Sequence, residues 1–417
     1  MSDQTLTTPT PTPRVSVGDV ARDYGTRLRG GDVGSLPAIL GLVALVIIFS
    51  VLKPGTFTNA FNFANLISQA AAIVVLAMGL VFVLLLGEID LSAGVAGGTS
   101  ASVLAILATK HDWPAIPALI GCLLTGALIG TAIGLLVARL GIPSFVVTLA
   151  FFLGLQGAML ALLGVGGTVG IRNEVLIKLN NDTLPVWLGW TLAVVLLVAY
   201  AVTTLLNIRR RQARGLVAPP MTLWAIKVVA LSALVIAVVG YLSQERSRNP
   251  MLISLKGVPL VLVIIVGLLI VLTFLLTKTA WGRHIYAVGG NAEAARRGGI
   301  NVARVKLSCF IMCSTLAAIA GILIASRDNG VSPTTGGDTT LLYAVGAAVI
   351  GGTSLFGGKG RILDAVIGGL VIAVIDNGMI LLNQPPGTVY MVTGGVLLLA
   401  ASVDAISRRR ATASGRG

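Results

Sequence analysis

The chain has 417 residues, of which 55% belong to the hydrophobic set AVILMFWYC and only 11% are charged. An average soluble domain carries about 25% charged residues, so this composition and the mean hydropathy of +0.94 exclude an ordinary soluble fold and predict a polytopic membrane protein. The formal net charge of +14 does not indicate nucleic-acid binding, because the basic residues lie in the gaps between apolar runs, where membrane topology places them.

The beginning of the chain is polar. Residues 1–35 include the stretch TLTTPTPTPR, whose composition cannot bury a core, so we expect a disordered cytoplasmic tail. A transmembrane domain is predicted over 36–407, and a short basic cytoplasmic tail over 408–417.

Twelve apolar runs follow one another after the tail. They are 36–52, 65–86, 92–108, 115–138, 143–164, 185–206, 221–243, 258–277, 306–325, 341–350, 361–382 and 388–406. A membrane-spanning helix needs about 20 apolar residues, so the run 341–350 is too short and predicts a broken or re-entrant segment buried in protein. The sequence therefore predicts an all-α, polytopic transmembrane helical bundle of about 12 passes, with 10 as the lower bound.

Lys and Arg are distributed unevenly between the connections. With the N-terminus in the cytoplasm, the cytoplasmic segments hold 21 of these residues and the outer loops hold 8. Because cytoplasmic segments carry the excess of Lys and Arg, both termini and the basic stretch 278–306 are predicted to face the cytoplasm. The outer loops 165–184 and 326–340 are long enough to dock an extracytoplasmic partner, although their turn residues favour solvated linkers.

The stretch 278–306 contains a complete signal for a short helix. Asn291 is placed to cap its N-terminus, and Glu293 lies in the first turn, where the helix dipole favours a negative charge. Its other end carries two cations and two glycines, which are Arg296, Arg297, Gly298 and Gly299. Cations suit a helix C-terminus, and glycine ends a helix at little cost. The pattern predicts either a contact element or a capped turn in a solvated loop.

Two Gly-rich breaks interrupt the apolar runs, GEIDLSAG at 87–94 and GGTSLFGG at 351–358. Interrupted segments in both halves of a transporter often mark the substrate region, and carboxylates at membrane depth usually face a cavity or a partner. The predicted lining of a translocation path is Glu88, Asp90, Ser92, Thr353, Ser354, Asp376 and Asn377. Two alternatives stay open: the first break is a tight turn in which Asp90 caps the next helix, and Asp376 with Asn377 joins neighbouring helices by hydrogen bonds.

Several kinds of chemistry have no sequence signal. No phosphate-binding loop occurs, because Gly357-Gly358-Lys359-Gly360 lacks both the spacing and the following hydroxyl. No catalytic triad or metal-ligand cluster appears, and Cys122, Cys309 and Cys313 lie inside apolar runs as reduced core residues. We therefore expect a protein that is not an enzyme, has no cofactor and depends on another protein for any use of ATP.

The motifs resemble those of the permease subunit of bacterial ABC importers for monosaccharides, the ribose, arabinose and xylose branch. The matching pieces are GEIDLSAG (87–94), PSFVVTLA (143–150), GRHIYAVGGNAEAARRGGINVARVK (282–306), AVIGGTSLFGGKG (348–360) and DNGM (376–379). The chain length and the basic insertion IRRRQARG (208–215) are most similar to the D-xylose permeases.

This resemblance implies a permease in the bacterial inner membrane that works with three partners. They are a cytoplasmic ABC ATPase, a periplasmic sugar-binding protein and a second permease copy. The implied function is import of D-xylose or a related monosaccharide. The alternatives are an ABC permease for another solute, such as a branched-chain amino acid or a different sugar, and an ion-coupled secondary transporter.

The same resemblance implies that the helix over 291–300 is a coupling helix that sits in a cleft of the ATPase. The implied coupling residues are Gly289, Gly290, Asn291, Glu293, Ala295, Arg296, Arg297, Gly299 and Ile300. Gly289 and Gly290 would let the backbone enter the helix, and the two arginines would meet the ATPase. The family pattern reads AARLSGI where this chain has AARRGGI, so Arg297 and Gly298 depart from it.

Overall fold

The computed structural model describes residues 34–164, 167–247 and 254–413, together with Gly18, Arg22 and Thr26. Nearly all of the predicted tail over 1–35 therefore lies outside the described residues, as do the last four residues of the predicted tail over 408–417. Helix dominates the described part of the chain, and the only strands there are two of two residues each.

Twelve apolar helices correspond one to one with the twelve predicted runs. They are α2 (Leu36–Leu52), α3 (Ala60–Leu85), α4 (Ala93–Thr109), α5 (Ala115–Ala138), α6 (Ser144–Leu163), α8 (Val186–Ala213), α9 (Met221–Leu242), α10 (Leu260–Lys278), α13 (Val302–Arg327), α14 (Asp338–Gly351), α15 (Ile362–Leu381) and α16 (Pro386–Ala413). Within the described residues, 8 helices are long and apolar enough to cross a membrane, and shorter apolar helices accompany them. The predicted polytopic helical fold is confirmed.

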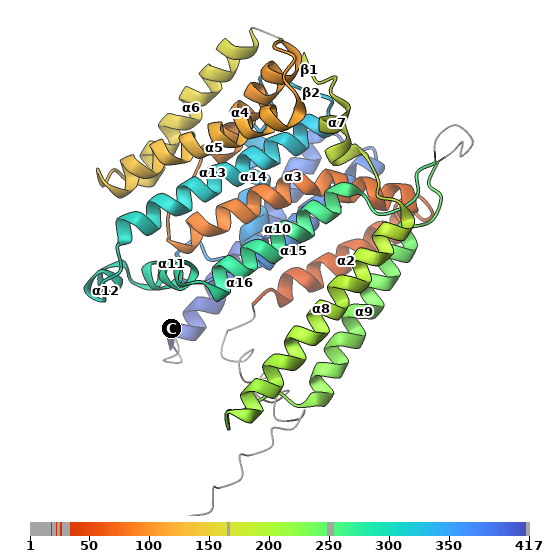
Figure 1. Cartoon of the computed structure of the whole chain (residues 1–417), viewed down its shortest axis with the longest axis vertical. Coiled ribbons are helices and arrows are strands. Elements are labelled where there is room, and N and C mark those ends of the chain that lie inside the picture. Colours follow the sequence, from red (N-terminus) through yellow and green to blue (C-terminus); the bar gives the residue numbers. More distant parts are fainter. Residues whose placement is uncertain are drawn as a thin grey trace, which may run out of the picture.

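The remaining elements lie at the two ends of the bundle (Figure 1). At one end, which we call the α7 end, lie α7 (Glu174–Asn181) and the antiparallel strands β1 (Val169–Gly170) and β2 (Gly330–Val331). At the other end, the α12 end, lie α11 (Ala280–Gly290) and α12 (Ala292–Arg297).

The α7 end is more ordered than a pair of solvated linkers. β1 and β2 join the two long loops, with Val169 paired to Val331. The Ser326 hydroxyl at the end of α13 donates to the Ile177 carbonyl at 2.8 Å and accepts from the Asn180 amide at 2.9 Å. The preference for solvated linkers was therefore wrong, because these side chains hold α7 against α13.

α3, α13 and α15 form the centre of the bundle. In the most apolar 18 residues of each helix, 83% of the residues are buried in α3, 72% in α15 and 61% in α13. α13 packs against α3, α4 and α5. A Cβ added to Gly97 would lie 2.4 Å from the Ala317 carbonyl oxygen, and one added to Gly130 would lie 2.5 Å from the Phe310 carbonyl oxygen. Small residues thus allow the close backbone approach that is typical of helices packed in lipid.

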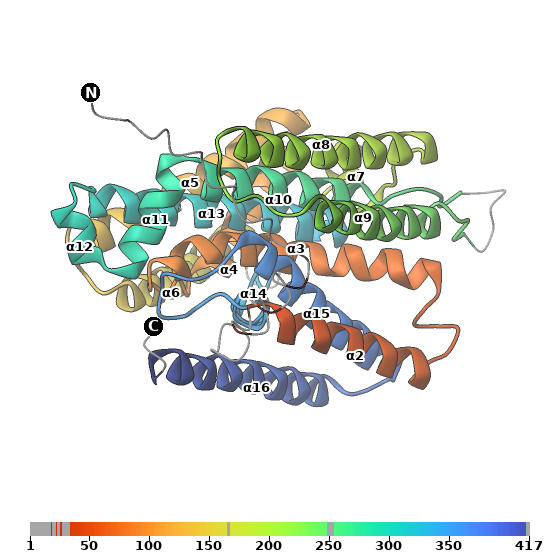
Figure 2. The same ribbon diagram turned by 90° about the horizontal axis from the view of Figure 1, so that it is seen from below.

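The hairpin of α8 and α9 lies at the periphery. In the most apolar 18 residues of each helix, only 11% of the residues are buried in α8 and 6% in α9. The Trp224 indole N–H of α9 donates a hydrogen bond to the Thr204 hydroxyl of α8 at 3.0 Å and joins the two helices. Figure 2 shows α8 and α16 at opposite edges of the bundle. The pair that carries the basic insertion is therefore appended to the ten other apolar helices. By contrast, the short helices α4 and α14 lie largely buried in protein, where incomplete spans are tolerated.

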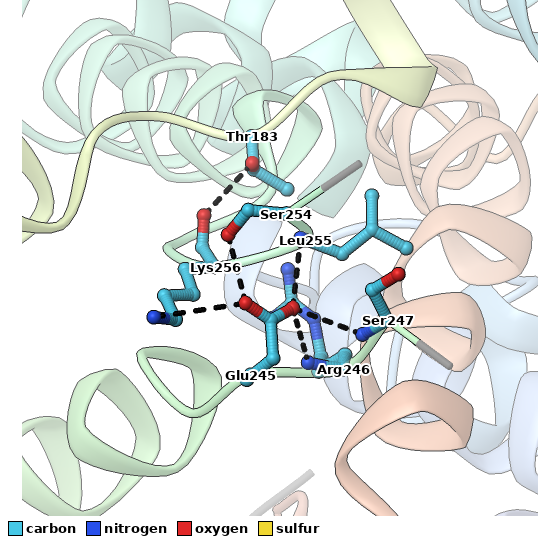
Figure 3. Close-up of polar contacts among 7 residues, drawn as sticks. All are labelled: Thr183, Glu245, Arg246, Ser247, Ser254, Leu255 and Lys256. Carbon is cyan, nitrogen blue, oxygen red and sulfur yellow. Dashed lines mark hydrogen bonds and ion pairs between the residues drawn. The ribbon is translucent and has the colours of Figure 1, made fainter. Parts of the chain in front are cut away.

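A carboxylate fastens the connection between α9 and α10 at the α7 end (Figure 3). Glu245 accepts hydrogen bonds from the Ser247 amide at 3.0 Å, from the Leu255 amide at 3.0 Å and from the Ser254 hydroxyl at 2.8 Å. Lys256 adds an ion pair at 3.6 Å. These backbone and hydroxyl donors lower the pKa of Glu245 to about 2, because hydrogen bonds to the ionised form favour it.

We expect Glu245→Gln to loosen this connection at neutral pH. The folded pKa of about 2 is below the ordinary value of 4.5. The stabilisation is therefore complete above about pH 4.5 and is lost as the pH falls through about 2. The difference in thermal midpoint between wild type and variant, measured from pH 7 down to pH 2.5, should shrink with acidification. Glu174→Gln is the control, since its pair with Lys178 is exposed and worth little. A difference that grows with acid would contradict this assignment.

Candidate functional site

Three connections meet at the α12 end: residues 86–92 between α3 and α4, the α11–α12 segment, and residues 352–361 between α14 and α15. The local sequence explains the first turn of α11, because the Thr279 hydroxyl accepts a hydrogen bond from the Gly282 amide at 3.2 Å. The first break and the second break touch, since a Cβ on Gly87 would lie 3.4 Å from the Phe356 carbonyl oxygen. Three of the five quoted motifs therefore contribute to one region.

Glycines allow these connections to touch backbone to backbone. A Cβ on Gly289 would lie 1.8 Å from the Leu85 carbonyl oxygen and 2.9 Å from the Gly358 amide nitrogen. That amide donates to the same Leu85 carbonyl at 2.8 Å. Gly87 and Gly357 have positive φ values of 73° and 84°, which glycine adopts without strain. The end of α3, the end of α11 and the 357–358 turn thus form one contact with no room for a side chain at Gly289.

Side chains brace α11 on both of its flanks. The Tyr286 hydroxyl donates to the Gly360 carbonyl at 2.8 Å. The Trp281 indole N–H donates to the Ser308 hydroxyl at 2.7 Å, and its ring stacks on Phe82 with centroids 5.3 Å apart. A displacement of α11 would therefore be transmitted directly to α3, to α13 and to the connection that precedes α15.

α12 has the caps and charges that the sequence predicts. The Asn291 side chain accepts from the Ala294 amide at 2.9 Å. Glu293 pairs with Arg296 at 3.0 Å and with Arg297 at 3.4 Å, and all three side chains are exposed. Their exposure leaves the charged face of α12 available to another molecule.

The other side of α12 packs against the protein. Ala295 is buried, and its carbonyl accepts from the Ile300 amide at 3.0 Å. Gly299 has the left-handed conformation, with φ of 84°. The expectation that Gly289 and Gly290 let the backbone enter the helix was wrong, because both belong to the last turn of α11. The chain turns instead at Asn291, whose φ is −160°.

The first break holds two carboxylates in different environments. Glu88 forms an ion pair with Lys306, and both side chains are mostly buried. Asp90 is 1% exposed, and its Oδ1 accepts from the Ser92 amide at 2.9 Å and from the Ser92 hydroxyl at 2.6 Å. Burial raises the pKa of the Asp90 carboxyl, while the Ser92 hydrogen bonds act in the opposite direction. Ser92, rather than Asp90, is the N-cap residue of α4.

α6 also contacts the first break. The Ser144 hydroxyl accepts from the Ile89 amide at 3.3 Å, and the Thr148 hydroxyl donates to the Ile89 carbonyl at 3.3 Å. At the second break, the Ser354 hydroxyl accepts from the Phe356 amide at 3.0 Å, whereas the buried Thr353 hydroxyl has no partner among the described residues. The structure thus places five of the predicted path residues in the two breaks, which touch each other at Gly87 and Phe356.

The other two predicted path residues lie toward the α7 end of α15. Asn377 is buried and exchanges two hydrogen bonds with Asn62 of α3, at 2.9 and 3.0 Å. This pair joins two helices, as the interhelical alternative proposed. Asp376 points to a different face of α15 and is only partly buried. The seven residues therefore form two groups rather than one site.

Several functional candidates escaped the sequence reasoning. Lys306, Tyr286, Ser144 and Thr148 lie in the quoted motifs, but no local pattern identifies their partners. The partners lie far away in the sequence; Lys306 and Glu88 are 218 residues apart. The only sequence signal for these residues is that they lie inside the quoted motifs.

We expect Glu88→Gln and Lys306→Gln each to destabilise the protein, by about 1 to 3 kcal/mol, because either change leaves a mostly buried charged group without its partner. The double variant should lose less stability than the sum of the two single variants, since it removes both charges. Thermal midpoints in lipid nanodiscs measure this. Lys178→Gln, which breaks an exposed pair, is the control and should have no measurable effect. Additive losses in the double variant would argue against a direct interaction.

The fold and this site define a polytopic helical membrane protein with a braced, charged contact helix at one end of the bundle, and comparison with known proteins identifies its family. Residues 62–401 match the model of the family described as the branched-chain amino acid transport system permease component. The chain belongs to this family of ABC-transporter permeases.

Named relatives cover almost the whole chain. The xylose transport system permease protein XylH of Escherichia coli K12 is 36% identical over 89% of this chain and 92% of its own length. The XylH protein of Haemophilus influenzae is 34% identical over 90% of this chain and 98% of its own length. The ribose import permease protein RbsC of Escherichia coli K12 is 30% identical over 92% of this chain and 96% of its own length. No solved structure matches the chain.

Proposed function

We propose that this chain is the membrane permease subunit of an ATP-driven importer for D-xylose or a related monosaccharide. The names of the relatives that match over nearly the full length support the solute class. The observation that carries the proposal is α12, a capped helix with an exposed charged face that is braced through α11 against both helix breaks.

The mechanism follows from that bracing. The Lys/Arg excess assigns the α12 end and both termini to the cytoplasm, where a separate ABC ATPase would bind α12. Motion of α12 passes through Gly289 to the end of α3 and to the 357–358 turn, so both breaks move together. The bundle then alternates between outward-open and inward-open states, as transporters with broken helices do.

Three partners complete the proposed importer. The ATPase supplies the energy, since the chain has no phosphate-binding loop. A periplasmic sugar-binding protein docks at the α7 end, where α7, β1 and β2 form an ordered surface. A second permease copy forms the other half of the path. Within the permease domain over 36–407, the coupling element is the loop 278–306.

Reconstitution in proteoliposomes tests the proposal. The permease is combined with candidate ATPases and sugar-binding proteins encoded beside it, and uptake of labelled D-xylose, D-ribose and L-leucine is measured with and without ATP. We expect pentose uptake that needs ATP, the ATPase and the binding protein. Uptake of leucine but of neither sugar would support the alternative function, an ABC permease for branched-chain amino acids. Uptake driven by an ion gradient without the ATPase would refute the ABC mechanism.

A further inference from the structure

An apolar groove opens between α2 and α16 at the α12 end of the bundle. Both helices pack on α15, and α16 also packs on α14, so the four helices form its walls and floor. Its volume is about 350 Å³, which is within the range of about 300 to 1,000 Å³ that is typical of small-molecule sites. Ile48 on one rim is 48% exposed and Leu399 on the other is 69% exposed. The groove is therefore open along an apolar face of the bundle, where lipid surrounds it.

The groove has the length of one membrane leaflet. Along α2 its lining runs from Pro37 to Ile48, which is about 17 Å at 1.5 Å per residue. The hydrocarbon core of a bilayer is about 30 Å thick, so one leaflet contributes about half of that. The lining of α14 lies in its last turn, whereas Val371 lies halfway along α15. The groove therefore extends from the membrane surface at the α12 end to about the middle of the bilayer.

Small residues keep the middle of the groove open. Gly41 lines it, and a Cβ added to Gly41 would have no atom within 4 Å. Ala38 and Ala44 lie beside it on α2 and are also small. Among the described residues that line the groove, Lys359 is the only one with a polar side chain. The interior thus offers apolar contact and space but no hydrogen-bonding side chain, which suits a hydrocarbon chain.

Basic side chains lie at the surface end of the groove. Lys359 is exposed in the second break. Two residues further on, the Arg361 guanidinium donates to the Ser35 hydroxyl at 2.9 Å, which joins the second break to the start of α2. Arg361 also pairs with Asp364 at 2.8 Å. Cationic donors therefore stand where an apolar groove meets the membrane surface, and basic pockets between transmembrane helices bind anionic lipid head groups.

We propose that this groove binds one anionic phospholipid from the leaflet at the α12 end. An acyl chain lies between α2 and α16, and the phosphate accepts charge-assisted hydrogen bonds from Lys359 and Arg361. A free phosphate ion would leave the apolar part empty, and a sugar there would leave its hydroxyls without partners. A phospholipid matches both parts. In the proposed orientation this is the cytoplasmic leaflet, and the assignment does not otherwise depend on the transported solute.

The head-group end of the groove adjoins the contact at Gly289. The Lys359 carbonyl accepts from the Ser354 amide at 2.8 Å, and the preceding Gly358 amide donates to the Leu85 carbonyl at 2.8 Å. The following carbonyl, of Gly360, accepts from the Tyr286 hydroxyl. The backbone on both sides of Lys359 is thus fixed to α3 and α11. A lipid bound to Lys359 therefore holds the same turn that α11 contacts.

Lipid retention tests the assignment. The full-length permease in detergent is incubated with equal amounts of phosphatidylglycerol and phosphatidylcholine that have the same acyl chains, and native mass spectrometry counts the bound lipids. We expect one phosphatidylglycerol per chain, retained about tenfold more than phosphatidylcholine, the effect of one added charged interaction. Lys359→Gln should remove this preference. Lys278→Gln, an exposed lysine at the same end of the bundle, should keep it. Equal retention of the two lipids by the wild type overturns the assignment.

Filling the groove supplies a second variant. Gly41→Phe places a ring in the open space and should lower retained phosphatidylglycerol by about tenfold, because the acyl chain no longer fits. Gly154→Phe on α6 is the matched control, since a Cβ there also has no atom within 4 Å and the position lies outside the groove. Ala44→Phe, one turn from Gly41, repeats the test if Gly41→Phe does not fold. Unchanged retention in these groove variants overturns the assignment.

Photocross-linking locates the bound lipid. Phosphatidylglycerol with a diazirine in its acyl chain is placed in nanodiscs with the permease, and the cross-linked peptides are identified. Most cross-links should fall on the groove residues of α2 and α16, while the peripheral α8 and α9 report the background of lipid contact. Equal cross-linking of all these helices overturns the assignment. Absence of cross-links on α2, together with loss of permease dimers in Gly41→Phe, would identify a second permease copy as the occupant instead.

These measurements use neither sugar nor ATPase, so they are independent of the importer proposal. If phosphatidylglycerol is retained in the groove but no ATP-driven uptake occurs in any combination of partners, the importer proposal fails and the lipid site stands. If pentose uptake depends on ATP but the wild type retains both lipids equally, the importer stands and the lipid site fails.

Discussion

Replacing Gly289 with alanine is expected to destabilise the permease and to abolish ATP-driven uptake. The added Cβ would lie 1.8 Å from the Leu85 carbonyl oxygen, a distance that no real contact tolerates, so α11 must move away from the end of α3. Overpacking of this kind costs about 1 to 3 kcal/mol. The displaced helix would also lose the contact through which α12 acts on both breaks. Thermal midpoints in nanodiscs and uptake in proteoliposomes measure the two effects.

Gly290→Ala is the matched control for this prediction. Both glycines belong to the last turn of α11, so the gain in helix propensity is similar in the two variants. At Gly290, however, no atom lies within 4 Å of the added Cβ. We expect this variant to keep its stability and its uptake. Equal behaviour of the two variants would mean that the close contact at Gly289 has no role in coupling.

Reversing the charge of Arg296 is expected to weaken binding of the ATPase while leaving the permease folded. Arg296 is 67% exposed on α12, and its pair with Glu293 is a surface interaction that contributes little stability. An arginine at the centre of an interface commonly costs about 2 kcal/mol when it is lost. Arg296→Glu should therefore reduce association with the ATPase at least about tenfold. Co-purification and ATP-driven uptake measure this, and docking of the sugar-binding protein should survive.

Arg210→Glu supplies the matched control, because it makes the same charge change in the basic insertion at the end of the peripheral α8. A loss of ATPase binding in both variants would indicate a general effect of cytoplasmic charge. Unchanged binding in Arg296→Glu would remove α12 from the coupling mechanism. Arg297→Glu extends the test to a position where this chain departs from the family pattern.

The helices were predictable because the bilayer imposes a length and a composition on each of them. α2 and α5 have the predicted bounds, and the other apolar helices start or end within a few residues of the predicted runs, except where α8 and α16 continue as polar helix. α7 and α11 were missed. Both are short amphipathic helices outside the apolar runs, and side chains such as Asn180 and Trp281 hold them in place by hydrogen bonds to α13.

The residues of the site were predictable only in part. The caps and charges of α12 lie within a few residues of one another, so the local sequence suffices to predict Asn291 as the cap and the first-turn position of Glu293. The role of Gly289 depends on Leu85, which comes from a different helix. A single sequence contains no record of which distant segments meet.

The sequence by itself determined that this protein is a membrane-embedded bundle with twelve apolar segments and that α12 is a short, capped, charged helix. Both features depend only on residues close together in the chain, namely the length of each apolar segment and the capping residues of the helix. Only the tertiary structure decided what α12 is attached to and how the polar residues divide. It joined the two breaks through Gly289, paired Glu88 with Lys306, and bonded Asn377 to Asn62 while Asp376 lies on another face of α15. These contacts join residues that are far apart in the sequence, so they depend on how all the helices of the bundle pack together.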